Sequence, residues 1–353
     1  MTQNTHDFDL SAYDFDLPSD QIADRPVSCR HDSKLLVYDA RLDKVIHSKF
    51  LNIADYLPSD SLLVLNRSKV FPGRLLGKKT TGGLAELLLL SPKPLKTTQV
   101  PLYSVMIKTT GRKKVGDRFS FENNLTAEIQ AIHEDGTFSV RFNIDEISSL
   151  LEKIGHTPIP PYIRNGIDDE RDKTDYQTVY ASEPGSIACP TAGLHFTAQV
   201  FSRLKEKKID TATVSLHVGP GTFAPVKCEN IMEHKMHKES FIVDNENAVK
   251  ILSNPKRIAV GTTTLRTLES CVTAAGKLEF TPDEWRSTDI FLHPGKKVHS
   301  VSGLVTNFHL PRSTLLMLVG SLIGREKTLE LYALAVREKY RFFSYGDAML
   351  ILR

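Results

Sequence analysis

The feature that most constrains the fold is a change in the pattern of apolar residues near Leu62. From there to about Asp145 the chain consists of short apolar runs separated by glycine, proline and charged residues, with no long helical pattern. Seven runs have the length of a strand: LLVLN, KVFPGRLLG, GGLAELLLL, YSVMIK, DRFSF, LTAEIQAI and GTFSVRF. Many short strands at close spacing are typical of a small antiparallel barrel. The sequence therefore predicts a β-barrel domain at residues 62–149.

The rest of the chain alternates strand and helix patterns. Strands are predicted at residues 241–244, 257–260, 289–293 and 304–309, and helices at residues 247–252, 263–275, 313–323 and 326–340. Such alternation favours a mixed, largely parallel sheet covered by helices. A chain of 353 residues is long enough for two cores. We therefore expect an α/β fold in which a discontinuous mixed-sheet domain, residues 1–61 and 150–353, carries the small antiparallel β-barrel as an insertion.

One predicted strand, residues 211–218, has a polar face that ends in a histidine. Thr211, Thr213, Ser215 and His217 alternate with apolar residues. A strand between helices usually buries two apolar faces. A ligand crevice is therefore expected at the carboxyl end of this strand. His195 lies nearby in the sequence, just before a predicted helix for which Thr197 is the expected N-cap.

Two strand-to-helix corners carry further polar residues. In RIAVGTTTLRTLES, backbone N–H groups and the hydroxyls of Thr262–Thr264 suit a carboxylate, a phosphate or a ribose, and Arg266 suits a carboxylate. The alternative is that the threonines only cap the helix. In LVTNFHLPRSTLLMLVG, His309 ends a strand and Arg312 lies in the turn. Neither segment has the glycine spacing of a nucleotide or dinucleotide loop.

Histidine and cysteine spacing gives a weak metal signal. His234 and His237 are three residues apart, but the glutamate of an HExxH motif and a suitably spaced cysteine are missing. A metal-dependent hydrolase that uses this pair is kept as an alternative. The four cysteines form no CxxC pair, so a disulfide framework is not expected. Cys189, six residues before His195, fits a buried thiol better than a nucleophile.

The net charge of +3 is too small to indicate by itself that the protein binds a nucleic acid. Local basic groups either face a polyanion or are ordinary turn and surface residues: Arg67, Lys69, Arg74, Arg112, Lys113 and Lys114. An RNA-binding module without catalysis is the other alternative. The polar, acidic N-terminus is unlike a signal peptide and no run reaches a membrane span, so a cytoplasmic location is expected.

Six motifs occur along the chain: PTAGLHFT (190–197), LHVGPGTFAPVK (216–227), HKMHKE (234–239), VGTTTLRTLES (260–270), TNFHLPRSTLLMLV (306–319) and YRFFSYGDAMLI (340–351). Together they resemble one known family, the S-adenosylmethionine:tRNA ribosyltransferase-isomerases of queuosine biosynthesis. The entry segment DFDLPSDQIADRPVSCRHDSKLLV and the phrase NRSKVFPGRLLGKK resemble it too, so nearly the whole chain is covered. Cys189 departs from the more common alanine of the family phrase.

The resemblance implies a cytoplasmic enzyme, expected to be a monomer, whose α/β domain carries an inserted barrel. Its co-substrate would be S-adenosylmethionine, which donates its ribosyl group, and no metal or bound cofactor is needed. The acceptor would be 7-aminomethyl-7-deazaguanine at the wobble position of tRNA. The product would be epoxyqueuosine, with adenine and methionine released.

That chemistry needs a base of tuned pKa. His195 is the first candidate, because a helix N-terminus disfavours imidazolium, and His217 and His237 are the others. Thr262, Thr263, Thr264 and Arg266 are expected to hold the methionine carboxylate or the ribose, and Arg312 a phosphate. The same motifs supply the remaining candidate substrate-binding residues: Thr191, Gly193, Gly219, Gly221, Thr222, Asn307 and His309. The basic groups at 67–74 and 112–114 are the candidate tRNA contacts.

Overall fold

The computed structural model describes residues 5–95, 100–219, 221 and 226–353. The chain forms two compact units. The large unit comprises Met1–Arg67, Thr178–Ala181 and Pro190–Arg353, and the barrel unit comprises Ser68–Gln177 and Ser182–Cys189. In the described part of the chain, no helix has both the length and the apolar character needed to cross a membrane.

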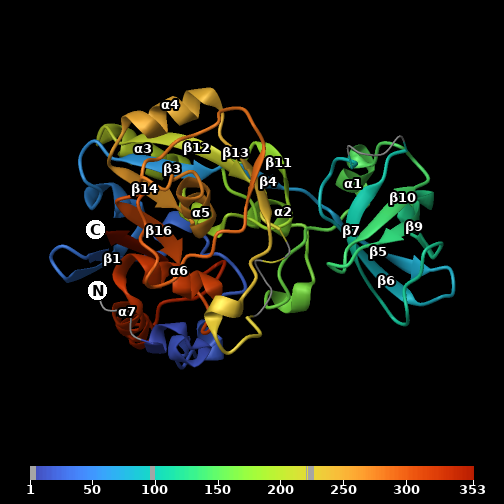
Figure 1. Cartoon of the computed structure of the whole chain (residues 1–353), viewed down its shortest axis with the longest axis horizontal. Coiled ribbons are helices and arrows are strands. Elements are labelled where there is room, and N and C mark those ends of the chain that lie inside the picture. The colour runs from blue at the N-terminus through green and yellow to red at the C-terminus, as the bar shows by residue number, and fades with distance from the viewer. Residues whose placement is uncertain (1–4, 96–99, 220, 222–225) are drawn as a thin grey trace. The chain divides into compact units, whose positions relative to one another are not determined.

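A nine-stranded mixed sheet forms the centre of the large unit (Figure 1). Its order is β15 (Arg286–Thr288), β13 (Glu239–Ile242), β12 (Asp210–Leu216), β3 (Leu62–Asn66), β14 (Arg257–Val260), β16 (Gly303–Asn307), β17 (Ala348–Leu352), β1 (Lys34–Asp39) and β2 (Lys44–Lys49). The four central strands β12, β3, β14 and β16 are parallel. Strand β17 runs antiparallel to β16 and parallel to β1, and the pairings at both edges are antiparallel.

Helices cover both faces of this sheet because its strands are apolar on both sides. In β14, Ala259 faces one core cluster while Ile258 and Val260 face the other. The first cluster is covered by α4 (Asn245–Ser253), α5 (Thr262–Glu269), α6 (Thr314–Ile323) and α7 (Arg325–Arg337), and the second by α3 (Ala198–Glu206). The predicted cap of α3 is confirmed, since the Thr197 side chain accepts from the Val200 N–H.

The barrel unit contains a closed six-stranded antiparallel barrel. Its strands are β5 (Arg74–Lys79), β6 (Leu84–Leu89), β7 (Tyr103–Thr109), β8 (Arg118–Ser120), β9 (Thr126–Ile132) and β10 (Phe138–Phe142). Alternate residues fill the interior, as Ala85, Leu87 and Leu89 do in β6. The unit also holds the parallel pair β4 (Ser68–Val70) and β11 (Glu183–Ser186), and helices α1 (Ser148–Ile154) and α2 (Asp172–Asp175).

Short 3-10 turns complete the described elements. They are η1 (Thr5–Phe8), η2 (Leu10–Tyr13), η3 (Ser19–Gln21), η4 (Arg30–Asp32), η5 (Phe50–Asp55), η6 (Glu122–Asn124), η7 (Arg164–Gly166), η8 (Thr191–His195) and η10 (Ile231–Glu233).

The predicted α/β class with an inserted antiparallel barrel is confirmed. Four local predictions differ from the structure. The run LLVLN, expected in the barrel domain, is β3 at the centre of the large sheet, and residues 150–177 lie in the barrel unit. The predicted strand at 289–293 is wrong, because Leu292 packs into the large core from a loop and the strand is β15. The strand predicted to reach residue 218 ends at Leu216.

Candidate functional site

His195 is the most enclosed of the candidate bases. Its side chain is 4% exposed, and it lies at the end of η8. Nδ1 is 2.8 Å from the Ser33 hydroxyl, and Nε2 is 3.3 Å from the side-chain nitrogen of Asn307. The Phe50 ring packs against the imidazole with centroids 4.9 Å apart. Side chains from segments far apart in the sequence therefore hold this one ring.

These hydrogen bonds assign the tautomer of His195. The Asn307 amide nitrogen also donates to the carbonyls of Phe343 (3.1 Å) and Ser344 (3.4 Å), which directs its N–H groups toward acceptors. Nε2 of His195 must then accept, and Nδ1 carries the proton. That proton is donated to Ser33, whose hydroxyl donates in turn to the Arg30 carbonyl at 3.1 Å. The ring is neutral and fully oriented.

Burial explains the neutral state of His195. It lowers the pKa of the imidazole to about 3, and the positive charges of Arg341 and Arg30 act in the same direction. The cavity beside the ring, lined by Arg30, Ser33, Arg341 and Ser344, has a volume of about 10 Å³. That is room for about one water molecule. In this buried environment the ring accepts a hydrogen bond but is a weak base.

His309 is held separately from His195. Its Nε2 lies 2.8 Å from the Thr306 hydroxyl, and its backbone N–H donates to the Tyr332 hydroxyl at 3.1 Å. Burial lowers its pKa to about 3. The ring is 6% exposed, so His309 has the environment of a core histidine that fixes the end of β16.

His217 and His237 lie along the segment that follows β12. The His217 ring packs against Trp285 with centroids 4.7 Å apart, and its backbone N–H donates to the Ser240 carbonyl. His237 is exposed, and a Cβ on Gly221 would overlap its ring, so the close approach requires glycine there. Thr222, another candidate of this segment, lies outside the described residues.

Arg266 has a buried partner that the sequence reasoning missed. Its guanidinium forms an ion pair with Glu239, and both residues are about nine-tenths buried or more. The other Glu239 oxygen accepts from the Gly219 N–H at 3.1 Å, while Arg266 Nε donates to the Ile290 carbonyl. One side of the Arg266 guanidinium is therefore already bound to a carboxylate of the protein. Glu239 links this arginine to the glycine-rich segment that begins at Gly219.

The hydroxyls at the start of α5 are used largely within the protein. Thr264 donates to the Val260 carbonyl at 2.7 Å, and Thr263 accepts from the Asn66 amide at 3.3 Å. Asn66 also exchanges hydrogen bonds with the backbone of Leu216. Gly261 precedes the helix with φ of 92°, a conformation that favours glycine. Thr262 is 9% exposed, and its backbone lies at the helix N-terminus.

Gly193 is required by packing. A Cβ at this position would overlap the Tyr180 hydroxyl. The neighbouring candidate Thr191 opens η8 and is half-buried. Both positions shape the turn that presents His195.

Arg67 explains the polar face of β12. Its guanidinium donates to Ser215 Oγ at 3.0 Å and to Thr213 Oγ1 at 3.4 Å, and it pairs with Asp244 at 3.0 Å. The row of hydroxyls that suggested a ligand crevice is thus filled by an arginine of the same unit. The candidate tRNA contact Arg67 has protein partners on several sides.

Arg312 is tied to the N-terminal segment. Its side chain pairs with Asp14, and its backbone N–H donates to the Tyr13 carbonyl. The side chain is 55% exposed, so the guanidinium still reaches solvent.

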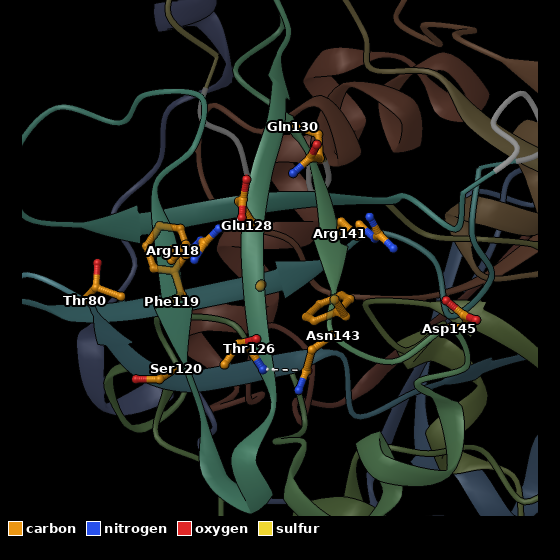
Figure 2. Close-up of a pocket in the computed structure, with 12 residues that line it drawn as sticks. Thr80, Arg118, Phe119, Ser120, Thr126, Glu128, Gln130, Arg141, Asn143 and Asp145 are labelled. Carbon is orange, nitrogen blue, oxygen red and sulfur yellow. Dashed lines mark hydrogen bonds and ion pairs between the residues drawn. The ribbon is translucent and has the colours of Figure 1, made fainter.

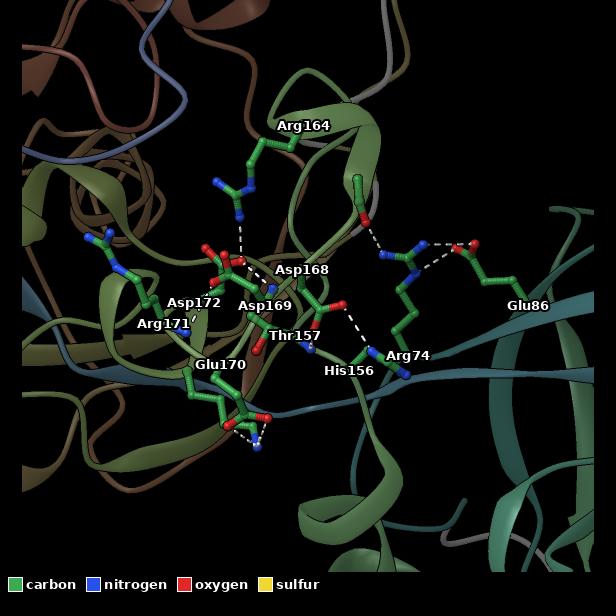
Figure 3. A network of polar contacts seen from close by, with 12 residues as sticks. Arg74, Glu86, His156, Thr157, Arg164, Asp168, Asp169, Glu170, Arg171 and Asp172 are labelled. Atoms are coloured by element: carbon green, nitrogen blue, oxygen red, sulfur yellow. Dashed lines mark hydrogen bonds and ion pairs between the residues drawn. The ribbon is translucent and has the colours of Figure 1, made fainter.

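Arg74 belongs to a polar network of the barrel unit (Figure 3). It pairs with Glu86 at 3.2 Å and also donates to the Gly166 carbonyl. In the same network, Asp168 accepts from His156 Nδ1 and from the Thr157 N–H, each at 2.9 Å. Arg74 therefore holds the irregular segment that follows α1. Lys69 is exposed on β4.

The basic triplet at residues 112–114 lies in the loop between β7 and β8. Arg112 and Lys114 are exposed, whereas Lys113 is half-buried with Nζ 5.9 Å from the Phe138 ring centre. The loop is anchored because Asp117 accepts from the Lys114 N–H at 2.9 Å and pairs with Lys79 at 2.7 Å. The triplet is a fixed cationic surface.

A hollow of about 460 Å³ lies against β8, β9 and β10 (Figure 2). Its lining mixes both signs of charge, and Arg118 pairs with Glu128 at 2.7 Å across it. Phe119 and Phe142 form a buried floor rather than exposed rings. None of the predicted site residues lies there.

Potential metal ligands gather at a place that the sequence did not indicate. In the part of the chain that the structure describes, ligand atoms of Cys29, His31 and Asp32 lie within 4.8 Å of one another. No such group includes His234 or His237 among the described residues. The His234 ring packs on Phe291 instead, and burial together with the charge of His237 lowers its pKa.

Residues 10–351 match the model of a family described as queuosine biosynthesis protein. This chain belongs to the queuosine biosynthesis protein family. Two of its relatives are named S-adenosylmethionine:tRNA ribosyltransferase-isomerase. The protein from Clostridioides difficile strain 630 is 44% identical over 346 residues, covering 96% of this chain and 98% of the relative. The protein from Acetivibrio thermocellus is 46% identical over 350 residues, covering 97% and 99%.

A solved structure of the family has the same architecture. The crystal structure of S-adenosylmethionine tRNA ribosyltransferase from Thermotoga maritima aligns with a TM-score of 0.52 and 33% identity, over 97% of this chain and all of that one.

Three polar residues in this family member were not among the predicted site residues. Ser33 contacts His195, Glu239 pairs with Arg266, and Asn66 joins β12 to α5. Glu239 closes the motif HKMHKE and Ser33 lies in the entry segment, so both were within stretches already singled out. Their partners lie far away in the sequence, which is why spacing did not reveal the contacts.

Proposed function

We propose that this chain transfers and isomerises the ribosyl group of S-adenosylmethionine onto 7-aminomethyl-7-deazaguanine at the tRNA wobble position. The observation that carries the proposal is the match to the named relatives at 44–46% identity over 96–97% of the chain. The products would be epoxyqueuosine in tRNA, adenine and methionine. The protein would work as a cytoplasmic monomer with no bound cofactor.

The reaction begins with removal of a proton from the ribose carbon that carries the sulfonium. Adenine leaves, the aminomethyl nitrogen attacks the anomeric carbon, and an epoxide closes as methionine is expelled. We assign the proton acceptor to His195, because Ser33 and Asn307 hold its ring as the tautomer whose Nε2 accepts. This role requires a higher pKa in the complex with substrate than the value of about 3 that burial gives the ring here. A hydroxyl group of S-adenosylmethionine that took the place of the Asn307 amide would donate its hydrogen bond to the same Nε2 atom.

The start of α5 and the Glu239–Arg266 pair support binding of the donor. Thr262 at the helix N-terminus offers backbone N–H groups for the methionine carboxylate or a ribose hydroxyl. Gly219 donates its N–H to Glu239, and Gly221 lies against the ring of His237, so these two glycines would border the donor on the other side. In this proposal His237 positions substrate, and His217 packs beside it on Trp285.

The test is a two-product assay with the full chain. Purified protein is incubated with S-adenosylmethionine and with tRNA that carries the deazaguanine precursor, and adenine release and tRNA mass are followed together. Equal amounts of adenine and modified tRNA are expected. Failure to release adenine above the control without enzyme would refute the proposal, and tRNA binding without turnover would favour an RNA-binding module.

The role of His195 has its own prediction. His195→Ala should lower turnover by about 10²-fold or more, because general base catalysis contributes that much. His47→Ala is the matched control, since His47 lies on β2 and contacts Tyr340 instead. Circular dichroism should show that both variants are folded. Wild-type turnover in folded His195→Ala would mean that this histidine is structural.

A further inference from the structure

Arg266 carries a buried nitrogen that no protein group uses in the described part of the chain. The residue is 5% exposed, its Nη1 pairs with Glu239, and its Nε donates to the Ile290 carbonyl at 3.3 Å. Among the described residues, the remaining nitrogen, Nη2, has no hydrogen-bond partner. A buried guanidinium N–H that donates to nothing is unfavourable, because it has lost its hydration without a replacement. Nη2 therefore points to an acceptor that a ligand brings.

The partners of Arg266 fix the place at which Nη2 is presented. The second oxygen of Glu239 accepts from the Gly219 N–H at 3.1 Å, which holds the carboxylate in position. Glu239 also begins β13, a strand that is paired with both β12 and β15. The guanidinium is thus held by the sheet before any ligand arrives, so little conformational freedom is lost on binding.

Thr262 lies on the same face of α5 (Thr262–Glu269) as Arg266. The two residues are four positions apart, which makes them neighbours on successive turns. Helical side chains lean toward the N-terminus, so the Arg266 side chain leans toward the turn that contains Thr262. The N–H groups of this first turn and the positive end of the helix dipole favour an anion. Thr262 is 9% exposed, so solvent touches this face at the start of the helix.

The surroundings of Arg266 favour a terminal carboxylate among the possible anions. A phosphate of an RNA backbone is attached to a sugar on both sides, whereas a carboxylate at the end of a flexible chain can enter a buried site. A terminal phosphate carries up to two charges and would meet the repulsion of Glu239 at close range. A carboxylate has a single charge and two oxygens, which suit guanidinium and helix N–H groups together.

We propose that Arg266 Nη2 and the first turn of α5 at Thr262 bind the carboxylate of S-adenosylmethionine, and that released methionine competes for the same place. The assignment rests on the proposed function, because that function supplies both molecules. Methionine keeps its carboxylate when the sulfonium bond breaks, so it keeps the contacts with Arg266. Accumulated product therefore raises the concentration of donor that the enzyme needs.

The first test measures binding without turnover. Isothermal titration calorimetry compares S-adenosylmethionine with its decarboxylated analogue on the full chain, in the absence of tRNA. The wild type should prefer the donor with the carboxylate by about 10- to 100-fold, as expected for hydrogen bonds to a charged group. Arg266→Lys keeps a positive charge beside Glu239 but lacks the second terminal nitrogen, so most of this preference should disappear.

Thr267→Val is the matched control for this variant. Thr267 lies on the same helix, and its hydroxyl donates to the Thr263 carbonyl at 3.0 Å, so the preference should stay at the wild-type level. Circular dichroism checks that each variant is folded. If the wild type binds both donors equally, the proposal is wrong. It is also wrong if Arg266→Lys weakens both donors by the same factor, because the arginine would then only maintain the structure.

The second test follows adenine release with tRNA present. Methionine should raise the KM for S-adenosylmethionine and leave kcat unchanged, whereas methioninol, which lacks the carboxylate, should have little effect. Inorganic phosphate at the same concentration should not compete, and competition equal to that of methionine would overturn the choice of a carboxylate. Absence of adenine release with an intact preference between the two donors would refute only the proposed function.

Discussion

Acid should destabilise the large unit because His195 becomes protonated on unfolding. The contribution of this one residue can be separated by comparing the wild type with a variant that lacks the ring. The pKa of this histidine is about 3 in the folded protein and about 6.5 when the ring is exposed. Between these pH values the unfolded chain therefore binds a proton at His195, and the folded chain does not. The stability that this adds is fully present above pH 6.5 and is lost as the pH falls toward 3. Between pH 7 and pH 5 the expected loss is about 2 kcal/mol in the free energy of unfolding.

The assay is urea denaturation at pH 7 and pH 5, followed by fluorescence. Trp285 is the single tryptophan and belongs to the large unit, as His195 does, so its signal follows the relevant transition. His195→Gln removes the titrating ring, and its loss of stability between the two pH values should be smaller than that of the wild type by about 2 kcal/mol. His309→Gln should show a similar reduction, since burial also lowers that pKa to about 3.

This loss of about 2 kcal/mol changes little if the folded pKa of His195 lies about one unit higher, because pH 5 would still be above it. The refuting result is therefore clear. If His195→Gln and the wild type lose equal stability between pH 7 and pH 5, the ring titrates normally, and its burial and orientation are not as described.

Three further changes test the packing and the charges. Gly193→Ala should cost about 1–3 kcal/mol of unfolding free energy, because the new methyl overlaps the Tyr180 hydroxyl, and thermal denaturation measures the loss. Glu239→Gln should cost about 3–5 kcal/mol, since it leaves the Arg266 charge buried without its carboxylate, and urea denaturation measures it. Reversing the charges of Lys113 and Lys114 to glutamate should weaken tRNA binding and reduce its salt dependence, as measured by filter binding over a range of salt concentrations.

Each of these has a matched control. For Gly193→Ala, adding Tyr180→Phe should recover part of the loss, and no recovery would mean that the clash lies elsewhere. For Glu239→Gln, the exposed Glu246→Gln should change stability by less than about 0.5 kcal/mol, and an equal effect would contradict the burial argument. For the lysines, reversal of the exposed Lys296 and Lys297 should leave binding unchanged. Equal loss in both pairs would move the tRNA contact away from the barrel loop.

The sequence predicted well wherever the cause is local. The strand predicted at residues 257–260 is β14, and its apolar residues Ile258, Ala259 and Val260 pack into the cores on both faces of the sheet. Thr197 was expected as an N-cap, and the cap is present because a hydroxyl beside a helix start satisfies an N–H that has no other partner. The barrel was predicted for the same reason, since short strand-like runs separated by glycine and proline can be recognised without knowledge of distant residues.

Prediction failed where the meaning of a pattern depends on a distant partner. The sequence did not reveal that the β12 hydroxyls of Thr213 and Ser215 accept hydrogen bonds from Arg67, which follows β3. The run at 289–293 is apolar because Leu292 enters the core from a loop, not because it is a strand. The first short run beginning at Leu62 belongs to the large sheet, a choice that local pattern leaves open between two domains.

By itself the sequence determined the two fold types, the cap of α3 and the family. Only the tertiary structure decided what each polar side chain meets. His195 is neutral because burial lowers its pKa, and Ser33 and Asn307, 162 and 112 residues away, fix the orientation of its ring. Glu239 and Arg266 pair because two strand and helix ends converge. The burial of a polar group and its hydrogen-bond or ion-pair partners depend on all the residues packed around it. The sequence pattern shows only the neighbours of that group along the chain.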